Sequence, residues 1–126
     1  MSRKRQVATL RSARPAPPFW EVRFDADHPP DMGTFVLADL GGPLREPLFP
    51  SITDPMGFTT SVEPGHPLTR MLPGSAVDLL GPLGHGFRVG NAERLLLVSE
   101  AKLLPLIRPL FQAAPSVALV VEATTR

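Results

Sequence analysis

Polar and apolar residues alternate along much of the first two thirds of the chain. In one stretch, Trp20, Val22 and Phe24 fall on one face, while the charged residues between them fall on the other. A period of two residues is typical of a strand with one buried face. Prolines and glycines separate such stretches. The pattern predicts six short strands before residue 90, over residues 6–11, 19–24, 34–40, 44–53, 57–62 and 77–80.

The pattern changes after Gly90. Residues 94–98 and 117–121 are continuous apolar runs, which suit strands buried on both faces of a parallel sheet. Apolar residues recur between them at spacings of three and four, which predicts a helix over residues 99–114 with Ser99 as its N-cap. Pro105 predicts that this helix starts late or is kinked. The order strand, helix, strand indicates a parallel α/β unit.

Composition narrows the fold and the class of function. The 126 residues suffice for one ordinary domain, and 16 prolines favour a barrel or sandwich over a helical bundle. The absence of cysteine excludes disulfides, thiolate zinc sites and a cysteine-ligated iron–sulfur cluster in this chain. No apolar run approaches 18 residues and no secretory signal opens the chain, so we expect no membrane partner and a cytoplasmic protein.

Basic residues are concentrated near the N-terminus, although the formal net charge is only +1. A nucleic-acid-binding arm is one interpretation of such a run. Alternation over residues 6–11 favours a half-buried strand instead, so we expect no nucleic-acid partner. The basic residues concerned are Arg3, Lys4, Arg5, Arg11 and Arg14.

Glycines and prolines crowd the run PGSAVDLLGPLGHGF, residues 73–87. A turn at Pro73-Gly74 leads into the strand 77–80, and the glycines that follow predict a tight loop. The run resembles the end of the flavin-binding barrel in ferredoxin-reductase-type flavoproteins. It is most similar to the electron-transfer subunit of dihydroorotate dehydrogenase, where a PGD-x-x-x-x-x-GPLG-x-GF run is typical.

The resemblance implies a mainly β fold, with a six-stranded antiparallel (Greek-key) flavin-reductase-type barrel and a truncated β-α-β unit of the nucleotide-binding domain. It assigns residues 1–90 to an FAD-binding-type barrel and residues 91–126 to a remnant of a nicotinamide-binding domain. The family's flavin motif, an Arg followed by Pro, an aromatic or aliphatic residue, Ser and Ile, has its counterpart at residues 45–52. The Arg meets the flavin diphosphate in that family, and the Ser approaches the ring.

A second flavin element of the family opens a short helix, whose backbone amides face the phosphates. Residues 64–69 are its counterpart, with a histidine that either donates to a phosphate or is an ordinary loop histidine. The residues that the resemblance assigns to FAD are Arg45, Pro47, Leu48, Ser51, Ile52, Gly65, His66 and Thr69.

The nicotinamide-binding element departs from the family. Residues 99–104 contain no glycine that would let a dinucleotide approach the backbone, and Glu100 places a negative charge there. The distal cysteines that bind a two-iron cluster in the electron-transfer subunit are absent as well. We therefore expect no NAD(P) binding and no iron–sulfur cluster in this chain.

Two hypotheses for the function follow. In the first, the chain is an FAD-binding electron-transfer module that exchanges electrons with a redox partner subunit; it is related to flavoprotein oxidoreductases and is not active alone. In the second, it is a degenerate, non-catalytic barrel that acts as a scaffold or interaction subunit without flavin. The residues alone show no catalytic constellation, because the three histidines lie in separate predicted loops.

The apolar strands 94–98 and 117–121 predict an association surface. One helix can cover only one face of such a pair, which leaves an apolar face and an open edge. We expect a protein partner or a second copy of this chain to occupy that surface, and the alternative is that the barrel folds back over it. The residues expected at it are Leu95, Leu97, Val117, Leu119 and Val121.

Overall fold

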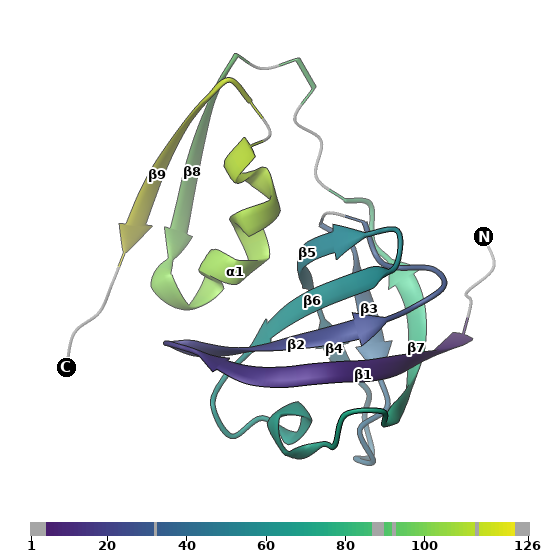
Figure 1. Cartoon of the computed structure of the whole chain (residues 1–126). Coiled ribbons are helices and arrows are strands. Elements are labelled where there is room, and N and C mark those ends of the chain that lie inside the picture. The colour runs from purple at the N-terminus through teal and green to yellow at the C-terminus, as the bar shows by residue number, and fades with distance from the viewer. Residues whose placement is uncertain (1–4, 32, 87–89, 92, 113, 123–126) are drawn as a thin grey trace.

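The computed structural model describes residues 5–31, 33–86, 90–91, 93–112 and 114–122. These residues form a seven-stranded antiparallel sheet and a separate two-stranded parallel sheet (Figure 1). The prediction of a mainly β fold is confirmed. The strands of the larger sheet are β1 (Arg5–Ala16), β2 (Phe19–Asp25), β3 (Phe35–Ala38), β4 (Glu46–Leu48), β5 (Pro50–Asp54), β6 (Gly57–Val62) and β7 (Ala76–Leu83).

The larger sheet curls into a barrel-like shape. Its hydrogen-bonded order is β4-β3-β7-β1-β2-β6-β5. The two outermost strands, β4 and β5, are consecutive in the chain and are separated only by Phe49. They are two halves of one bent strand, so the chain itself links the two ends of the sheet. This bent strand is the one predicted over residues 44–53, and counting it once gives the six predicted strands.

The core of the barrel is formed by the inward residues of the alternating strands. Leu10 on β1 and Phe24 on β2 are fully buried, and Phe24 stacks on Phe58 of β6 with ring centroids 5.2 Å apart. Charged residues on the outer face pair across strands. These pairs are Arg11 with Asp25, Arg14 with Glu21, and Arg23 with Asp54.

Strand β1 is longer than the sequence predicts. The proline-rich residues after Arg11 predict a stiff connection, yet β1 continues to Ala16, which pairs with Phe19 of β2. The neighbour on the other side, β7, pairs with β1 only over residues 5–9. The far half of β1 is therefore a sheet edge, where the missing proline N–H costs no ladder hydrogen bond.

Strand β7 also runs into its predicted loop. Gly81 lies inside β7 with a φ of +131°, and a Cβ at this position would lie 3.1 Å from the Phe35 carbonyl oxygen. The register between β3 and β7 shifts here, as in a β-bulge. Glycine is thus required for backbone geometry at this point. Phe87, the last residue of the family-like run, lies outside the described residues.

The second sheet consists of β8 (Arg94–Glu100) and β9 (Ser116–Glu122), which pair in parallel as predicted. The predicted helix over residues 99–114 is wrong in that Ser99 lies in β8 and caps nothing, but a late start near Pro105 is confirmed, because the α-helical turn begins at Leu104. Pro109 has no N–H to donate to the carbonyl of residue 105, so a regular α-helix cannot continue. The connection is η2 (Ala101–Leu103), α1 (Leu104–Ile107) and η3 (Arg108–Gln112), where η denotes a 3-10 helix.

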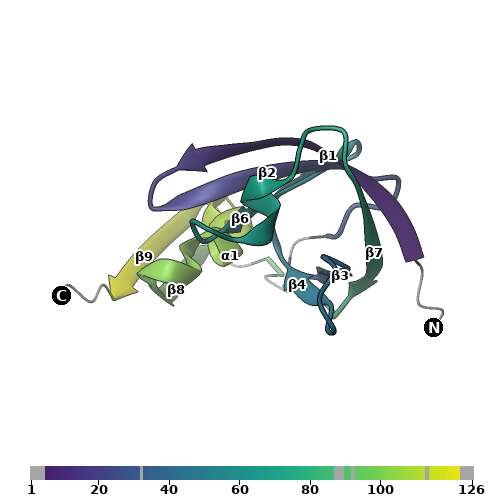
Figure 2. The same cartoon turned by 90° about the horizontal axis from the view of Figure 1, so that it is seen from below.

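The helical connection lies between the parallel strands and the barrel, where α1 contacts β5, β6 and β8 (Figures 1 and 2). Leu97 faces it and is buried, whereas Leu96 and Val98 on the opposite face are exposed. The prediction that both faces are buried is therefore wrong within this chain. The predicted association residues Leu95, Leu97, Val117, Leu119 and Val121 lie on the helix-facing side, and the open face carries Leu96, Val98, Ala118 and Val120.

Candidate functional site

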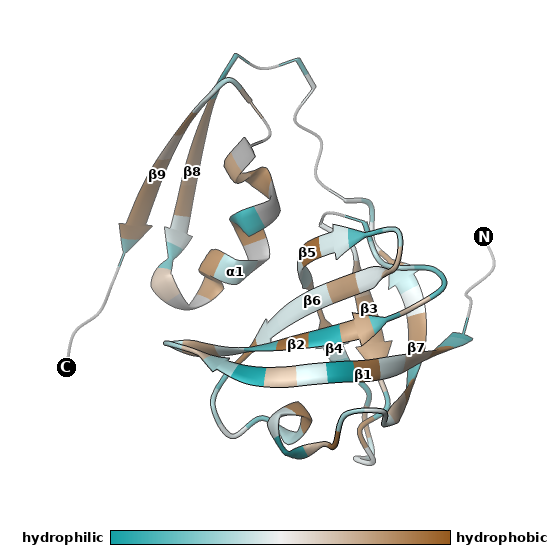
Figure 3. Ribbon diagram, viewed as in Figure 1, coloured by the Kyte–Doolittle hydropathy of each residue, from teal (hydrophilic) through white to brown (hydrophobic). Residues whose placement is uncertain are grey.

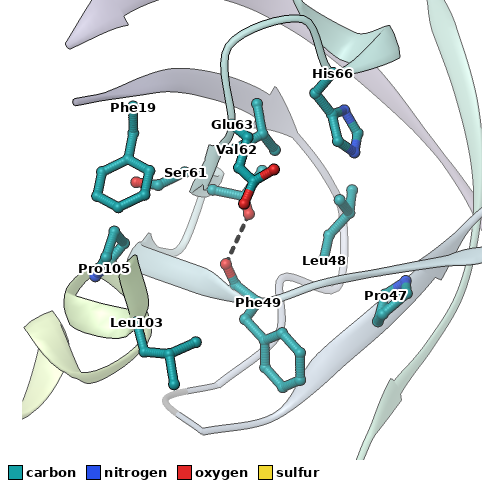
Figure 4. A pocket seen from close by; sticks show the side chains of 11 residues that line it. Phe19, Pro47, Leu48, Phe49, Ser61, Val62, Glu63, His66, Leu103 and Pro105 are labelled. Carbon is teal, nitrogen blue, oxygen red and sulfur yellow. Dashed lines mark hydrogen bonds between the residues drawn. The ribbon is translucent and has the colours of Figure 1, made fainter. Parts of the chain in front are cut away.

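A pocket of about 270 Å³ lies where the barrel meets the helical connection (Figure 4). Strands β4 and β6 and the turn that follows β6 form one side of it, and Leu103 and Pro105 form the other. Its volume approaches the range of small-molecule sites. Its lining residues are Phe19, Pro47, Leu48, Phe49, Thr60, Ser61, Val62, Glu63, His66, Leu103 and Pro105.

The bent strand is held in place by hydroxyl groups. The Thr60 hydroxyl donates to the Phe49 carbonyl at 2.7 Å, and the buried Ser51 hydroxyl donates to the Thr59 carbonyl at 3.2 Å. Pro47 and Pro50 flank the bend and lack backbone donors, as suits an interrupted strand. The bend exposes the Phe49 side chain to the pocket. The Ser51 hydroxyl therefore links β5 to β6 by a hydrogen bond.

His66 is fixed at the rim of the pocket from two directions. Gly65, with a φ of +87°, completes the turn after β6 and leads into the 3-10 helix η1 (Pro67–Arg70). The Nδ1 atom of His66 accepts a hydrogen bond from the Leu68 N–H at 3.2 Å, and its Nε2 atom lies 2.8 Å from Glu46 Oε2. The ring proton therefore resides on Nε2, facing the Glu46 carboxylate. His66 joins η1 to β4 and so shapes one edge of the pocket.

Arg45 is engaged with the barrel itself. Its guanidinium donates to Asp78 Oδ1 at 2.8 Å, to the Leu37 carbonyl at 3.1 Å and to the Asp78 carbonyl at 3.3 Å. Arg5 binds the second carboxylate oxygen of Asp78 at 2.8 Å. Hydrogen bonds from Arg5, the larger cause, and from Arg45 hold the pKa of the Asp78 carboxyl below its usual value. Arg45 does not line the pocket.

The structure brings together only part of the predicted site. Pro47, Leu48 and His66 line the pocket, and the other five predicted residues do not. Ile52 is exposed, and both the N–H and the hydroxyl of Thr69 donate to the His66 carbonyl. The lining residues that the sequence did not indicate are Phe19, Phe49, Thr60, Ser61, Val62, Glu63, Leu103 and Pro105.

A second hollow of about 260 Å³ continues from the pocket, with which it shares Phe19, Ser61 and Pro105. It runs between β1, β2 and the helical connection, and its walls are mainly apolar. At one side Glu21 accepts hydrogen bonds from Arg14 at 3.3 Å and from Arg108 at 3.2 Å. The two hollows together form one groove along the junction of the barrel with the parallel strands.

The described part of the chain holds no group of three or more His, Asp or Glu side chains arranged to bind a metal ion. No buried side-chain nitrogen or oxygen atom within these residues lacks a hydrogen-bond partner. Among the same residues, no helix has the length and apolar character needed to cross a membrane. The groove is the candidate binding site because it gathers Pro47, Leu48 and His66 of the predicted site.

Comparison with known proteins identifies the fold. No family model matches the sequence, and no curated protein matches it. Among solved structures, the ferredoxin reductase in carbazole 1,9a-dioxygenase is similar with a TM-score of 0.77 and 18% identity, over 98% of this chain and 43% of that chain. Its FAD apo form gives a TM-score of 0.75 and 19% identity, over 100% and 46%.

A siderophore-interacting protein from Acinetobacter baumannii is also similar, with a TM-score of 0.68 and 13% identity, over 100% of this chain and 60% of that chain. The chain has a ferredoxin-reductase-like fold. At these identities the likeness shows the fold alone. The chain spans about half the length of the reductase structures that it matches.

Proposed function

We propose that this chain is a flavin-associated electron-transfer module and that the pocket beside Phe49 receives the flavin ring. The observation that carries this proposal is the convergence of Pro47, Leu48 and His66, three predicted flavin residues, on one largely apolar pocket. A ferredoxin-reductase-like fold supports the same conclusion. The division at residue 90 and the closer relation to the dihydroorotate dehydrogenase subunit remain predictions.

The residues present fit a planar ring better than they fit the rest of FAD. Pro47, Leu48 and Val62 offer apolar surface, and Phe49 offers an aromatic face. A bound flavin would supply the electron-transfer chemistry. The chain would bind and orient the ring, and Leu103 and Pro105 would exclude water from its outer side. The FAD phosphates lack a comparable binding group, because the guanidinium of Arg45 is already paired with Asp78.

Binding is tested by adding FAD to the full chain and following visible absorbance and flavin fluorescence. Leu103 lines the pocket and is 45% exposed in the free chain, so Leu103→Asp places a carboxylate there that the bound ring would have to desolvate. Binding should weaken about tenfold or more, since desolvating an unpaired carboxylate costs well over 1 kcal/mol. Leu72→Asp is the matched control, because Leu72 is exposed and lies outside the pocket. Equal binding by both variants would place the ring elsewhere.

A redox partner belongs to the same proposal. The chain would pass electrons through flavin to or from a second protein. The exposed apolar face of β8 and β9 is available for such an association, and a second copy of this chain is the alternative occupant. Sedimentation of the purified chain distinguishes these: self-association indicates a second copy, and a monomer leaves the face free for another protein.

The chain is also expected not to bind NAD(P)H. Residues 99–104 lack glycine, and Glu100 is exposed at the end of β8. Without a glycine, the side chains of these residues would stand between a pyrophosphate and the backbone. A titration that shows micromolar NADH affinity, or hydride transfer by the isolated chain, would contradict this expectation.

The Arg45–Asp78 pair supports a second candidate function. With its phosphate-directed arginine committed to the barrel, the chain would be a scaffold or interaction subunit without flavin. A purified protein that is colourless, and stays so after equilibration with excess FAD and removal of free ligand, favours this second function.

A further inference from the structure

The guanidinium of Arg45 is engaged by groups of the barrel itself. Its two terminal nitrogens make three hydrogen bonds, two to backbone carbonyls and one to the Asp78 carboxylate. About a quarter of the side chain is exposed, 26%, so the pair is partly shielded from water. A phosphate that approached Arg45 would find its positive charge already compensated by Asp78, an oriented carboxylate partner that engages one of its donors.

Asp78 is a strong competitor because two arginines hold it. Arg5 binds Oδ2 and Arg45 binds Oδ1, each at 2.8 Å. The same two hydrogen bonds lower the pKa of Asp78, so the carboxylate remains ionised at neutral pH. Arg45 also donates hydrogen bonds to the backbone carbonyls of Leu37 and Asp78, which hold its guanidinium against the barrel. Arg5, Arg45 and Asp78 thus form a hydrogen-bonded network within the barrel.

The pocket itself offers an anion no compensation. The described lining residues include Glu63 and no arginine or lysine. His66, the remaining ionisable group, already faces the Glu46 carboxylate. In the adjoining hollow Arg108 is bound to Glu21. The described groups therefore favour a neutral ring over a phosphate at this site.

We propose that the site selects its ligand by an uncharged planar ring and not by a phosphate group, and that Asp78 sets this selectivity by holding Arg45. The inference rests on the proposed function and differs from the resemblance, which assigns Arg45 to the flavin diphosphate. Asp78 is a positioning residue in this scheme, since it touches Arg45 and not the ligand.

Riboflavin, FMN and FAD carry the same ring with increasing phosphate charge, so they separate the two modes of recognition. Titration of the full chain with each ligand should give dissociation constants within about threefold of one another. Asp78→Asn removes the competing charge and leaves the two bonds from Arg45 to backbone carbonyls in place. FMN and FAD should then tighten relative to riboflavin by up to about tenfold, the worth of one charged hydrogen bond. Combining Asp78→Asn with Arg45→Ala should remove that gain.

Asp54→Asn is the matched control, because Asp54 pairs with Arg23 across strands in the same manner, at 2.9 Å. This variant should leave the ratio of FAD to riboflavin affinity unchanged. A wild-type chain that prefers FAD over riboflavin by about tenfold or more, and loses the preference on Arg45→Ala, would overturn the inference and leave the proposed function standing. Failure of all three flavins to bind the wild-type chain would remove both.

A measurement without ligand tests the held arginine directly. Carboxyl NMR of the full chain follows the titration of Asp78 in the wild type and in Arg45→Ala. The pKa of Asp78 should rise in the variant, since one of its two partners is gone. An Asp78 titration that Arg45→Ala leaves unmoved would overturn the inference.

Discussion

The barrel and the parallel strands differ in how completely their apolar side chains are buried within this chain. Inward residues of the barrel such as Leu10, Phe24 and Phe58 are fully buried within this chain. In the parallel unit, Leu97 and Leu110 are buried, but Leu96, at 63% exposure, is not. Figure 3 shows apolar colour along most of β8 and β9, whereas colours alternate along β1 and β2. The barrel completes its own core, and the parallel strands keep one apolar face open.

Alternating and continuous apolar patterns in the sequence therefore carry different information about burial. Alternation states which residues of a strand share a face, and Val22 and Phe24 are fully buried on the predicted face, with Trp20 half-buried beside them. A continuous apolar run states only that both faces can be buried. It does not say what covers them.

The largest effect is expected in the barrel core. Phe24→Ala removes a fully buried ring stacked on Phe58 and should lower the free energy of unfolding by about 3–5 kcal/mol. Phe111→Ala is the matched change in the parallel unit, where the ring is 39% exposed, and should cost about 1 kcal/mol or less. Urea unfolding measures both. Equal losses would mean that the two regions share one core.

A close backbone approach gives the next effect. A Cβ at Gly57 would lie 2.0 Å from the Phe24 carbonyl oxygen, so Gly57→Ala must displace β2 or β6. Overpacking of this kind should lower stability by about 1–3 kcal/mol. Gly42→Ala is the control, because its nearest atom is the Leu44 carbonyl oxygen at 3.8 Å. A shift in thermal midpoint as large for Gly42→Ala would contradict the role of backbone contact.

Acid should weaken the barrel through its outer ion pairs. A hydrogen bond from Arg23 lowers the pKa of the Asp54 carboxyl, and hydrogen bonds from Arg5 and Arg45 lower that of Asp78. A lowered folded pKa means that the stabilisation is complete above the ordinary aspartate pKa of about 3.9 and is lost as pH falls through the folded values. Unfolding midpoints measured against pH should fall less steeply in the double variant Asp54→Asn, Asp78→Asn. Equal slopes would contradict this.

The smallest effect on stability is expected on the open face of the parallel strands. Leu96→Lys with Val98→Lys should change the free energy of unfolding by about 0.5 kcal/mol or less, because both side chains are exposed. The same change should abolish self-association and binding of a hydrophobic dye if that face is an interface. Leu44→Lys with Leu72→Lys is the control at exposed positions outside it. Association that survives the first pair would place the interface elsewhere.

Part of the candidate site could be predicted from the sequence. The resemblance led to Pro47 and Leu48 because they belong to one short motif, and to His66 because it follows a turn glycine. Phe19, Leu103 and Pro105 were missed, since they reach the pocket from distant parts of the chain. The engagement of Arg45 was missed for the same reason, because Asp78 lies on another strand.

From the sequence alone one can predict the order and approximate positions of the barrel strands, the parallel pair and the change of pattern at residue 90, but not how far β1 and β7 extend. This is possible because alternation, apolar runs and turn residues act over a few neighbouring positions. The fold in space was needed to show that β4 and β5 are one bent strand, that Leu97 of β8 is buried against the helical connection, and that Arg45 faces Asp78. These features depend on contacts between residues far apart in the chain, which local patterns do not record.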